Sequence, residues 1–424
     1  MTQIQASDTT LIRAQIHPRA LDHMPLFFDA AAPTVFTELI QNARRAGASR
    51  VDIAIEQANS NIGNDALKVT VQDNGHGIAD PSVLLSFGQS AWNEDLARRE
   101  RAAGMSLACL ARRGCSISSR AQAPRSQHAP GWRMRLGLDH FLGKSAATAA
   151  PDKTAPSPFG TCVTFHATES LSALRGAVTA SSRYAPLRVS LNGSELPRRY
   201  FLEAALYREE WNGVTLGVIR SRRPLYSEPN LNFHGLALDV RLPHVKSLDG
   251  EIWTVRADVV DCQELELVLP TRKEAVENAF LQELRDKAQL AIYRALAPAN
   301  PPPRFAYEDH ARAANASIDL PAPPIALRRW RPRTAEIDEW RRDTELVPLG
   351  PDSIIVEYDA DPPNTQTFYR TARRAKLSPI LFEADQRLTG YAWYDNLLRL
   401  TDVNTHFFGR YFLQRGTCIT HCFN

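Results

Sequence analysis

The feature that most constrains the fold is an amphipathic helical pattern that two strand-like segments follow. Between residues 33 and 46, apolar side chains recur at the spacing of one helical face, at Val35, Phe36, Leu39, Ile40 and Ala43. Gly47 is placed to end this helix in a left-handed turn. Strand patterns cover residues 50–56 and 66–72. Because an apolar helix face must be buried against another element, we expect residues 11–166 to form an α/β sandwich.

Similar patterns organise the next part of the chain. Strands are expected near residues 132–138 and 161–166, separated by an exposed loop at residues 145–158 that is rich in Ala, Pro, Ser and Thr. Asn192 and Gly193 lie between alternating apolar residues and predict a hairpin over residues 187–196. We place the start of a second domain at this hairpin. A strand at residues 265–269 and a long helix at residues 274–296 are expected to close it.

Proline then divides the chain. Several of its 28 prolines cluster in residues 298–325, which predicts a stiff linker because proline does not fit a helix interior or a central strand. The predicted order is an α+β two-layer sandwich at residues 1–186, a smaller α/β domain at residues 187–297, the linker, and a C-terminal α+β module at residues 326–424.

Composition excludes several classes of protein. The chain of 424 residues is 44% hydrophobic and 23% charged, which is typical of a globular protein. It has no apolar run long enough to span a membrane and no secretory signal, so a cytoplasmic location is expected. A net charge of +3 is too small to indicate nucleic-acid binding by itself. The six cysteines are interpreted mainly as small core residues, although Cys418, His421 and Cys422 offer three candidate zinc ligands.

The first candidate motif is Glu38-Leu-Ile-Gln-Asn42-Ala43, which places an acid and an amide four residues apart, on the helix face opposite the apolar stripe. A carboxylate in that position can deprotonate an attacking water, and an amide oxygen can ligate magnesium. By itself, this pattern is also that of an ordinary solvated helix face.

The second motif, Asp73-Asn-Gly75-His-Gly77-Ile78, follows the strand that is expected to end at residue 72. It offers a carboxylate at a strand end and a glycine backbone that a flat base can approach closely, although Asp-Asn-Gly is also favourable turn chemistry.

The third motif, Gly104-Met105-Ser106, opens an apolar helical pattern, and Gly160-Thr161 enters the strand that ends near residue 166. A glycine before a helix exposes amide donors that can stabilise phosphates, although a simple loop is the alternative.

In this order and at these separations, the three motifs resemble the GHKL ATPase superfamily, whose members share the Bergerat nucleotide-binding fold. The resemblance covers residues 11–166 and, more loosely, residues to about 296, where an HtpG-like or MutL-like transducer domain would lie. It implies that Glu38 is the general base, that Asn42 holds magnesium and that Asp73 accepts a hydrogen bond from the adenine amino group. It assigns the base pocket and the phosphate lid to Gly75, Gly77, Ile78, Gly104, Met105 and Ser106, and it lets Thr161 support the Asp73 end of the pocket.

The sequence departs from the family pattern in the lid and in the first helix. Ser106 stands where a further lid glycine is common, Arg45 stands where members often have Asp, and the lid at residues 86–106 is short. Arg272 and Lys273 follow a predicted strand, where related proteins present a cation to the terminal phosphate; solvated first-turn residues are the alternative.

Two basic clusters lie in the C-terminal module. The first is Arg328, Arg329, Arg331 and Arg333 around Trp330, and the second is Arg370, Arg373, Arg374 and Lys376 after Phe368 and Tyr369. Arginines interleaved with aromatic residues can contact phosphates and stack on bases, but a solvated surface is favoured because acidic residues follow the first cluster.

The leading hypothesis is an HtpG-like ATPase switch of chaperone or remodelling type that binds ATP with Mg2+ and acts on a client protein or as a homodimer. One alternative is a nucleic-acid-linked ATPase clamp in repair or anti-phage defence. The other is a sensor that binds ATP without hydrolysis.

Overall fold

A computed structural model describes residues 30–58, 66–86, 106–123, 129–221, 228–268, 272–299, 303–332, 345–357, 362–403, 412–414 and 420–422. The described chain divides into two compact units. The first covers residues 30–219, 228–243 and 255–288, and the second covers residues 220–221, 244–254 and the described residues from 289 onward. No helix among the described residues is long and apolar enough to span a membrane.

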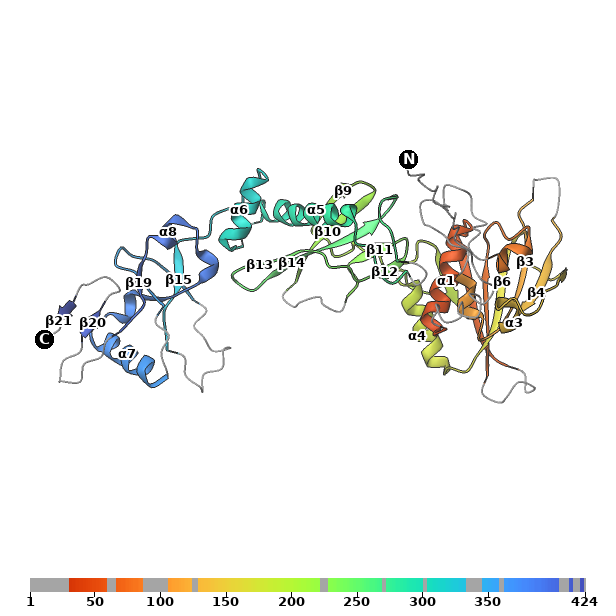
Figure 1. The fold of residues 1–424 in the computed structure, drawn as a ribbon, viewed down its shortest axis with the longest axis horizontal. Coiled ribbons are helices and arrows are strands. Elements are labelled where there is room, and N and C mark those ends of the chain that lie inside the picture. The colour runs from red at the N-terminus through yellow and green to blue at the C-terminus, as the bar shows by residue number, and fades with distance from the viewer. Residues whose placement is uncertain are drawn as a thin grey trace, which may run out of the picture. The chain divides into compact units, whose positions relative to one another are not determined.

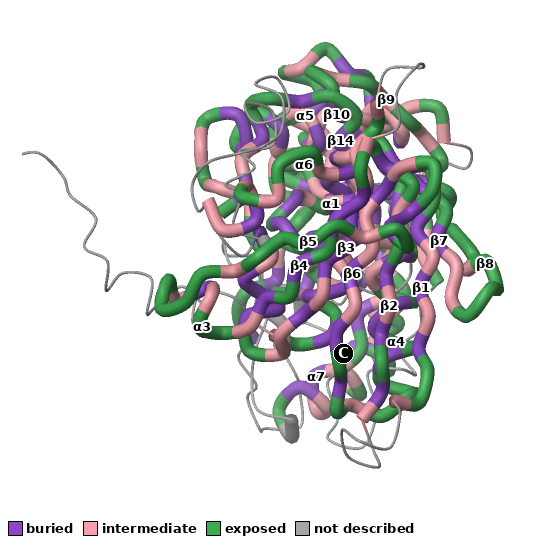
Figure 2. Tube along the Cα trace, turned by 90° about the vertical axis from the view of Figure 1, so that its right-hand side faces the viewer, coloured by how far each residue is buried: buried purple, intermediate pink, exposed green. Residues whose placement is uncertain are grey.

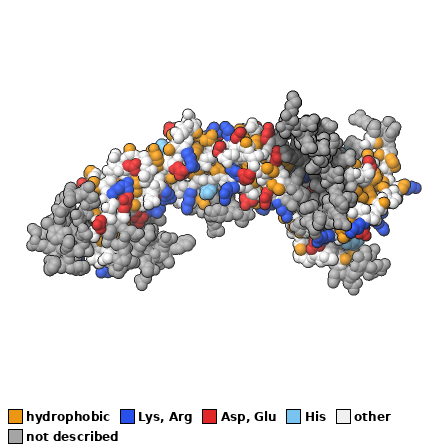
Figure 3. Space-filling view, in the orientation of Figure 1, with side chains coloured by type: hydrophobic (Ala, Val, Ile, Leu, Met, Phe, Trp, Pro, Cys, Tyr) orange, Lys and Arg blue, Asp and Glu red, His pale blue; other side chains and the backbone are white. Residues whose placement is uncertain are grey.

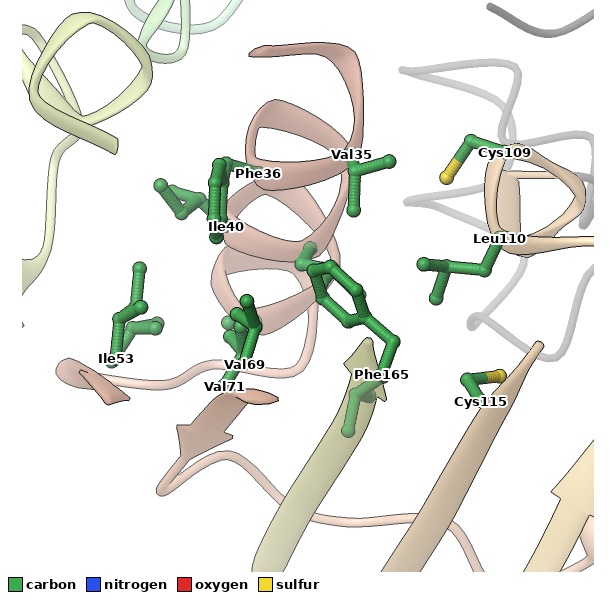
Figure 4. Packing of buried hydrophobic residues seen from close by; sticks show 14 of the residues in the cluster. Val35, Phe36, Ile40, Ile53, Val69, Val71, Cys109, Leu110, Cys115 and Phe165 are labelled. Atoms are coloured by element: carbon green, nitrogen blue, oxygen red, sulfur yellow. The ribbon is translucent and has the colours of Figure 1, made fainter. Parts of the chain in front are cut away.

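The first helix, α1, spans Ala32–Arg45 and begins with Pro33, whose fixed φ suits the first turn of a helix. It ends as predicted, because Gly47 adopts a φ of 70° directly after the last turn. The predicted apolar stripe is buried. Figure 4 shows Val35, Phe36 and Ile40 of α1 beside Val69 and Val71 of β2, in a cluster that Leu110 and Phe165 also enter.

An eight-stranded sheet supports this helix; its strands β3, β4 and β6 are labelled in Figure 1, and Figure 2 marks which positions along the strands are buried. The strand order is β5 (Ala149–Pro151), β4 (Trp132–Leu136), β3 (Cys115–Arg120), β6 (Gly160–Ala167), β2 (Leu67–Asp73), β1 (Arg50–Gln57), β7 (Arg188–Leu191) and β8 (Ser194–Glu195). All neighbours are antiparallel except β1 and β7, which are parallel. The helix α4 (Leu171–Ser182) connects β6 to β7 and packs against α1. The predicted α/β sandwich is therefore present.

Three expectations about this sheet need correction. The hairpin at residues 187–196 forms with Asn192 and Gly193 at its turn, but it completes the first sheet beside β1 instead of opening a second domain. The segment at residues 145–158 is mostly exposed, yet it contains β5. The strand that was expected to continue to residue 138 ends at Leu136, where the short helix α3 (Leu138–Phe141) follows.

A second sheet has the order β12 (Leu236–Leu238), β11 (Leu231–Phe233), β14 (Ile252–Val259), β10 (Val214–Ser221) and β9 (Tyr207–Trp211), with β13 (His244–Lys246) also paired to β14. The helix α5 spans Ala279–Leu296, so it begins five residues later than predicted (279 − 274). Phe280 of α5 stacks on Trp211 of β9 with ring centroids 5.0 Å apart. Instead of the strand expected at residues 265–269, an isolated bridge joins Leu267 to Ala275.

The predicted linker contains ordered structure. The helix α6 spans Tyr307–Asn315, and Phe305 and Ala313 are buried. Prolines thus flank a short helix instead of making a bare spacer. Beyond it, three parallel strands have the order β18 (Leu381–Glu383), β17 (Ile354–Val356) and β19 (Leu398–Leu400), and α7 (Pro362–Arg374) connects β17 to β18. Trp330 and Phe368 are buried in the core of this module, which is α+β as expected.

Candidate functional site

The polar residues between Glu38 and Arg45 of α1 are more buried than a solvated helix face would be. Glu38, Gln41 and Arg45 are buried, with 8%, 5% and 8% of their surface exposed, and Asn42 is half-buried. The face opposite the apolar stripe is therefore not a solvated surface. Burying charged and amide groups is costly unless they are bonded or serve a function. Gln41 and Arg45 were missed as candidates because helical spacing alone does not show what covers a polar face.

One carboxylate oxygen of Glu38 has no hydrogen-bond partner among the described residues. This oxygen, Oε2, is buried. Cys109 lies close to it on the 3-10 helix η3 (Ser106–Leu110); burial raises the pKa of the Cys109 thiol, and the negative charge of Glu38 raises it further. A buried carboxylate with an unused acceptor can take a proton from a water molecule.

Asp73 is the last residue of β2, and its backbone faces Thr161 of β6 in the sheet register. Its Oδ1 accepts a hydrogen bond of 2.8 Å from the backbone N–H of Gly75. Burial raises the pKa of Asp73, while the backbone N–H groups of Gly75 and Thr161 and the nearby His76 act in the opposite direction. The carboxylate is therefore held in a fixed orientation at a half-buried strand end.

Glycine is required at two positions after Asp73. A Cβ on Gly75 would lie 2.6 Å from the Cβ of Ala46 and 2.8 Å from the backbone oxygen of Ala46, directly after α1. Gly77 has a φ of 67°, and a Cβ there would lie 2.0 Å from the backbone oxygen of Arg120. Backbone atoms cannot move aside, so the motif depends on both glycines. The close approach of Gly75 to Ala46 also places the Asp73 motif at the C-terminal end of α1.

Ser119 connects Ile78 of the Asp73 motif with Gly160 and Thr161 at the start of β6. It was not identified from the sequence. Its side chain is fully buried on β3. The hydroxyl accepts a hydrogen bond of 2.9 Å from the N–H of Ile78, donates one of 2.9 Å to the carbonyl of Gly160, and lies 3.1 Å from the hydroxyl of Thr161. Trp132 donates its indole N–H to the carbonyl of Ile78 at 2.9 Å. Nothing in the local sequence around Ser119 signals this role.

Residues 30–169 match the family model of the histidine kinase-, DNA gyrase B-, and HSP90-like ATPases. This segment contains α1, the Asp73 motif and the Ser119 network. It is a GHKL-type ATPase domain.

No match is found among curated proteins. Among solved structures, the crystal structure of the N-terminal domain of a DNA repair protein is similar over 65% of this chain and 99% of its own length, with 11% sequence identity and a TM-score of 0.35.

The residues that were predicted to form the phosphate lid are only partly described. Gly104 and Met105 lie outside the described residues, and so does the side chain of Ser106. The apolar helix that was expected after Gly104 is the short 3-10 helix η3, which Leu110 and Cys109 anchor in the domain core. The described residues therefore show only how the segment that follows the predicted lid packs into the core.

Arg272 and Lys273 lie between β14 and α5. Because α5 begins at Ala279, neither residue lies in its first turn, although an exposed Lys273 still fits the alternative of a solvated residue. Arg272 is buried and has a φ of 54°, and its N–H donates to the carbonyl of Val268 at 2.8 Å. Lys273 is exposed. Of the two cations, Lys273 is the one that a ligand can reach without rearrangement of the buried chain.

The ATPase domain does not offer a simple magnesium site at Asn42. The Oδ1 atom of Asn42 accepts a hydrogen bond of 3.2 Å from Nη1 of Arg45. An amide oxygen can accept a second contact, but a divalent cation on it would stand beside a permanent positive charge. No cluster of three or more His, Cys, Asp or Glu side chains within the described ranges could hold a metal ion. The predicted zinc cluster lies outside what the structure describes, since Cys418 and the side chains of His421 and Cys422 are not among the described atoms.

Proposed function

We propose that this chain binds ATP along α1, hydrolyses it and uses the cycle as a conformational switch. The observation that carries the proposal is the order of groups along one helix. Glu38, with its unused buried oxygen, and Asn42 precede Ala46, which contacts the Asp73 motif. Glu38 and Ala46 are eight residues apart, or about 12 Å along a helix axis, a span comparable to an extended nucleoside triphosphate.

In this arrangement, adenine binds at the Asp73 end. The carboxylate of Asp73 accepts from the adenine amino group, and Gly75 and Gly77 leave room for the flat base. The Ser119 network fixes the backbone around Ile78 and Thr161, so the pocket is preorganised before nucleotide binds. The triphosphate then extends past Asn42 toward Glu38.

Hydrolysis uses Glu38 as the general base. As the water oxygen forms a bond to the terminal phosphorus, Glu38 takes a proton from that water, and the bond between phosphorus and the bridging oxygen breaks to leave ADP and phosphate. Lys273 is the proposed cation for the charge that develops on the transferred group. A divalent cation bound with the nucleotide would neutralise charge on the phosphates, and the residues of this chain position the base, the nucleotide and the water.

The switch is supported by a hydrogen bond between the ATPase helix and the second sheet. Nε2 of Gln41 donates to the backbone carbonyl of His234 at 3.0 Å, in the turn between β11 and β12. A ligand that shifts α1 must alter this bond, and a conformational change requires such a differential contact. The output that we propose is remodelling of a client protein or of a second copy of the chain.

A nucleic-acid clamp is the second candidate. The burial of its candidate residues favours contacts with phosphates over stacking on bases. Of the aromatic residues that were considered for base stacking, Trp330 and Phe368 are buried in the core, and Tyr369 is partly buried against it. Arg370, Arg373, Arg374 and Lys376 are exposed, so phosphate contacts are the part that stays available. On the face shown in Figure 3, the described basic side chains are interspersed with acidic ones.

Steady-state phosphate release and calorimetry on the full chain test the proposal. ATP binding with phosphate release supports it. Binding without release makes the chain an ATP sensor, and absence of both rejects an ATP-driven function. A duplex DNA affinity that falls steeply with salt would favour the clamp over the remodelling switch.

A further inference from the structure

A small cavity in the second compact unit is bordered by three arginines. Arg304, Arg328 and Arg387 line it, and Leu248 and Leu327 form part of its apolar wall. All of these residues belong to the second unit. The cavity has a volume of about 210 Å³. Pockets for drug-sized ligands begin at about 300 Å³, so this cavity is suited to a small chemical group.

Arg304 is a buried cation whose hydrogen bonding is incomplete. Only 7% of the residue is exposed. Its Nη2 donates to the carbonyl of Ala326 at 3.3 Å, whereas its Nη1 lies 3.7 Å from Oδ1 of Asp249, beyond hydrogen-bond range. Its Nε has no acceptor among the described residues. A buried charge is costly unless it is paired and hydrogen-bonded, so this position favours a further negative group.

Arg328 borders the same cavity without a partner of its own. It is half-buried at the end of β15 (Ala326–Arg328), and no hydrogen bond or ion pair engages its guanidinium within the described ranges. Burial lowers the pKa of Arg304, and the positive charges of Arg328 and Arg387 lower it further, against the opposite effect of nearby carboxylates. The three guanidinium groups therefore lie close enough to repel one another, and an anion between them would relieve this repulsion.

Acidic residues at the cavity determine which kind of anion it suits. Asp385 accepts hydrogen bonds of 2.8 Å from both Nε and Nη2 of Arg387, so this pair adds little net charge. Glu383 contributes a further carboxylate to the wall. Carboxylates beside the site disfavour a continuous chain of phosphates, because the neighbouring phosphates would meet like charge. A phosphate monoester instead places its charge and three acceptor oxygens in one compact group.

We propose that this cavity binds the phosphate group of a monoester, with Arg328 donating to its oxygens and Arg304 supplying charge from the buried wall. Arginine suits this role because it keeps its charge and presents several N–H donors that match phosphate oxygens. The residues involved differ from those assigned to ATP, so the inference goes beyond the proposed function and does not depend on it. It gives the second unit a ligand of its own.

Calorimetry on the full chain, with inorganic phosphate and phenyl phosphate as probes at constant ionic strength, tests this. The parent protein is expected to bind both. Arg328→Gln should weaken both affinities by about tenfold or more, the scale of a lost charge-assisted hydrogen bond, and Arg328→Lys should lose less because it keeps the charge. The matched control is Arg374→Gln, which removes an exposed arginine at the end of α7 and should leave both affinities unchanged.

Two results would overturn the inference. A parent protein that binds neither probe at millimolar concentration rejects it without any variant, which also covers a failure of Arg328→Gln to fold. Unchanged affinities in Arg328→Gln place the phosphate elsewhere.

Short oligonucleotides with and without a terminal phosphate identify the source of the group. Binding of the small probes alone supports a small monoester, and a preference for the phosphorylated oligonucleotide that Arg328→Gln removes supports a nucleic-acid end. Equal binding of both oligonucleotides that Arg328→Gln weakens would show recognition of the backbone and reject the monoester.

Discussion

The side-chain amide of Gln41 donates a 3.0 Å hydrogen bond to the backbone carbonyl of His234, a residue 193 positions later in the chain. Gln41 lies between Glu38 and Asn42, and His234 has a φ of 52° in the tight turn that joins β11 to β12. A Cβ added to the next residue, Gly235, would lie 3.0 Å from Cα of Ala185. The turn therefore packs closely against the segment between α4 and β7, and the carbonyl of His234 in this turn accepts a hydrogen bond from α1.

Gln41→Leu is expected to uncouple nucleotide from the second sheet. The variant lacks the N–H donor to His234, but it keeps Glu38 and the Asp73 motif, so affinity for ATP should stay within about threefold of the parent. Hydrogen exchange should show nucleotide-dependent protection of residues 231–238 in the parent and its loss in the variant. Gln72→Leu on the exposed side of β2 is the control. Equal protection in parent and variant would show that coupling takes another route.

Asp73→Ala is expected to remove most of the affinity for ATP, because the adenine amino group loses its charged acceptor. A hydrogen bond to a charged group contributes about 1.5–3 kcal/mol, so calorimetry should show a loss of about tenfold to a hundredfold. Asp52→Ala removes a carboxylate from the neighbouring strand, where it accepts from Ser190 at 2.7 Å, and should bind ATP normally. Parent-like affinity in Asp73→Ala would disprove the adenine assignment.

Glu38→Ala should keep nucleotide affinity and lower the rate of phosphate release by about a hundredfold or more, as expected when only a general base is removed. The alanine also removes a buried charge, so thermal unfolding should show a fold at least as stable as the parent. Glu56→Ala, on the exposed end of β1, is the matched control. If turnover in Glu38→Ala is unchanged, another group activates the water.

Lys273→Ala tests the cation between β14 and α5. Since Lys273 is exposed, the substitution should not change the melting temperature, whereas Arg272→Ala would perturb a buried position. Affinity for ADP should be unchanged, and turnover should fall by about tenfold or more if the ammonium meets the terminal phosphate. Small-angle scattering should also show a weaker difference between the ADP and ATP-analogue states. Parent-like turnover and scattering would remove Lys273 from the site.

Gly77→Ala separates a steric requirement from a conformational one. Alanine at a φ of 67° is strained, and its Cβ would lie 2.0 Å from the backbone oxygen of Arg120. Gly193 has a similar φ of 81° with nothing near its Cβ direction, so Gly193→Ala should cost only about 1–2 kcal/mol of unfolding free energy. Gly77→Ala should cost clearly more in denaturant unfolding. Equal costs would mean that the motif can shift to accept a side chain.

Patterns of short range were predicted well from the sequence. The apolar stripe of α1, its end at Gly47, the strands β1 and β2 and the position of Asp73 at a strand end depend on periodicity and turn chemistry within a few residues of each other. The three motifs were recognised for the same reason, and the family match over residues 30–169 confirms the kind of domain that they indicate. The roles of the individual site residues stay predictions.

What the sequence by itself determined is therefore the type of the local elements around α1, β1 and β2 and the kind of ATPase domain to which they belong. Only the tertiary structure decided which polar groups the fold encloses. Glu38 and Arg45 became buried, Ser119 met Ile78 and Thr161, and the hairpin after α4 joined the first sheet beside β1. The physical reason is distance along the chain: hydrogen bonds such as that from Gln41 to His234 join segments that no local pattern relates, and their free energy exists only when the chain has folded.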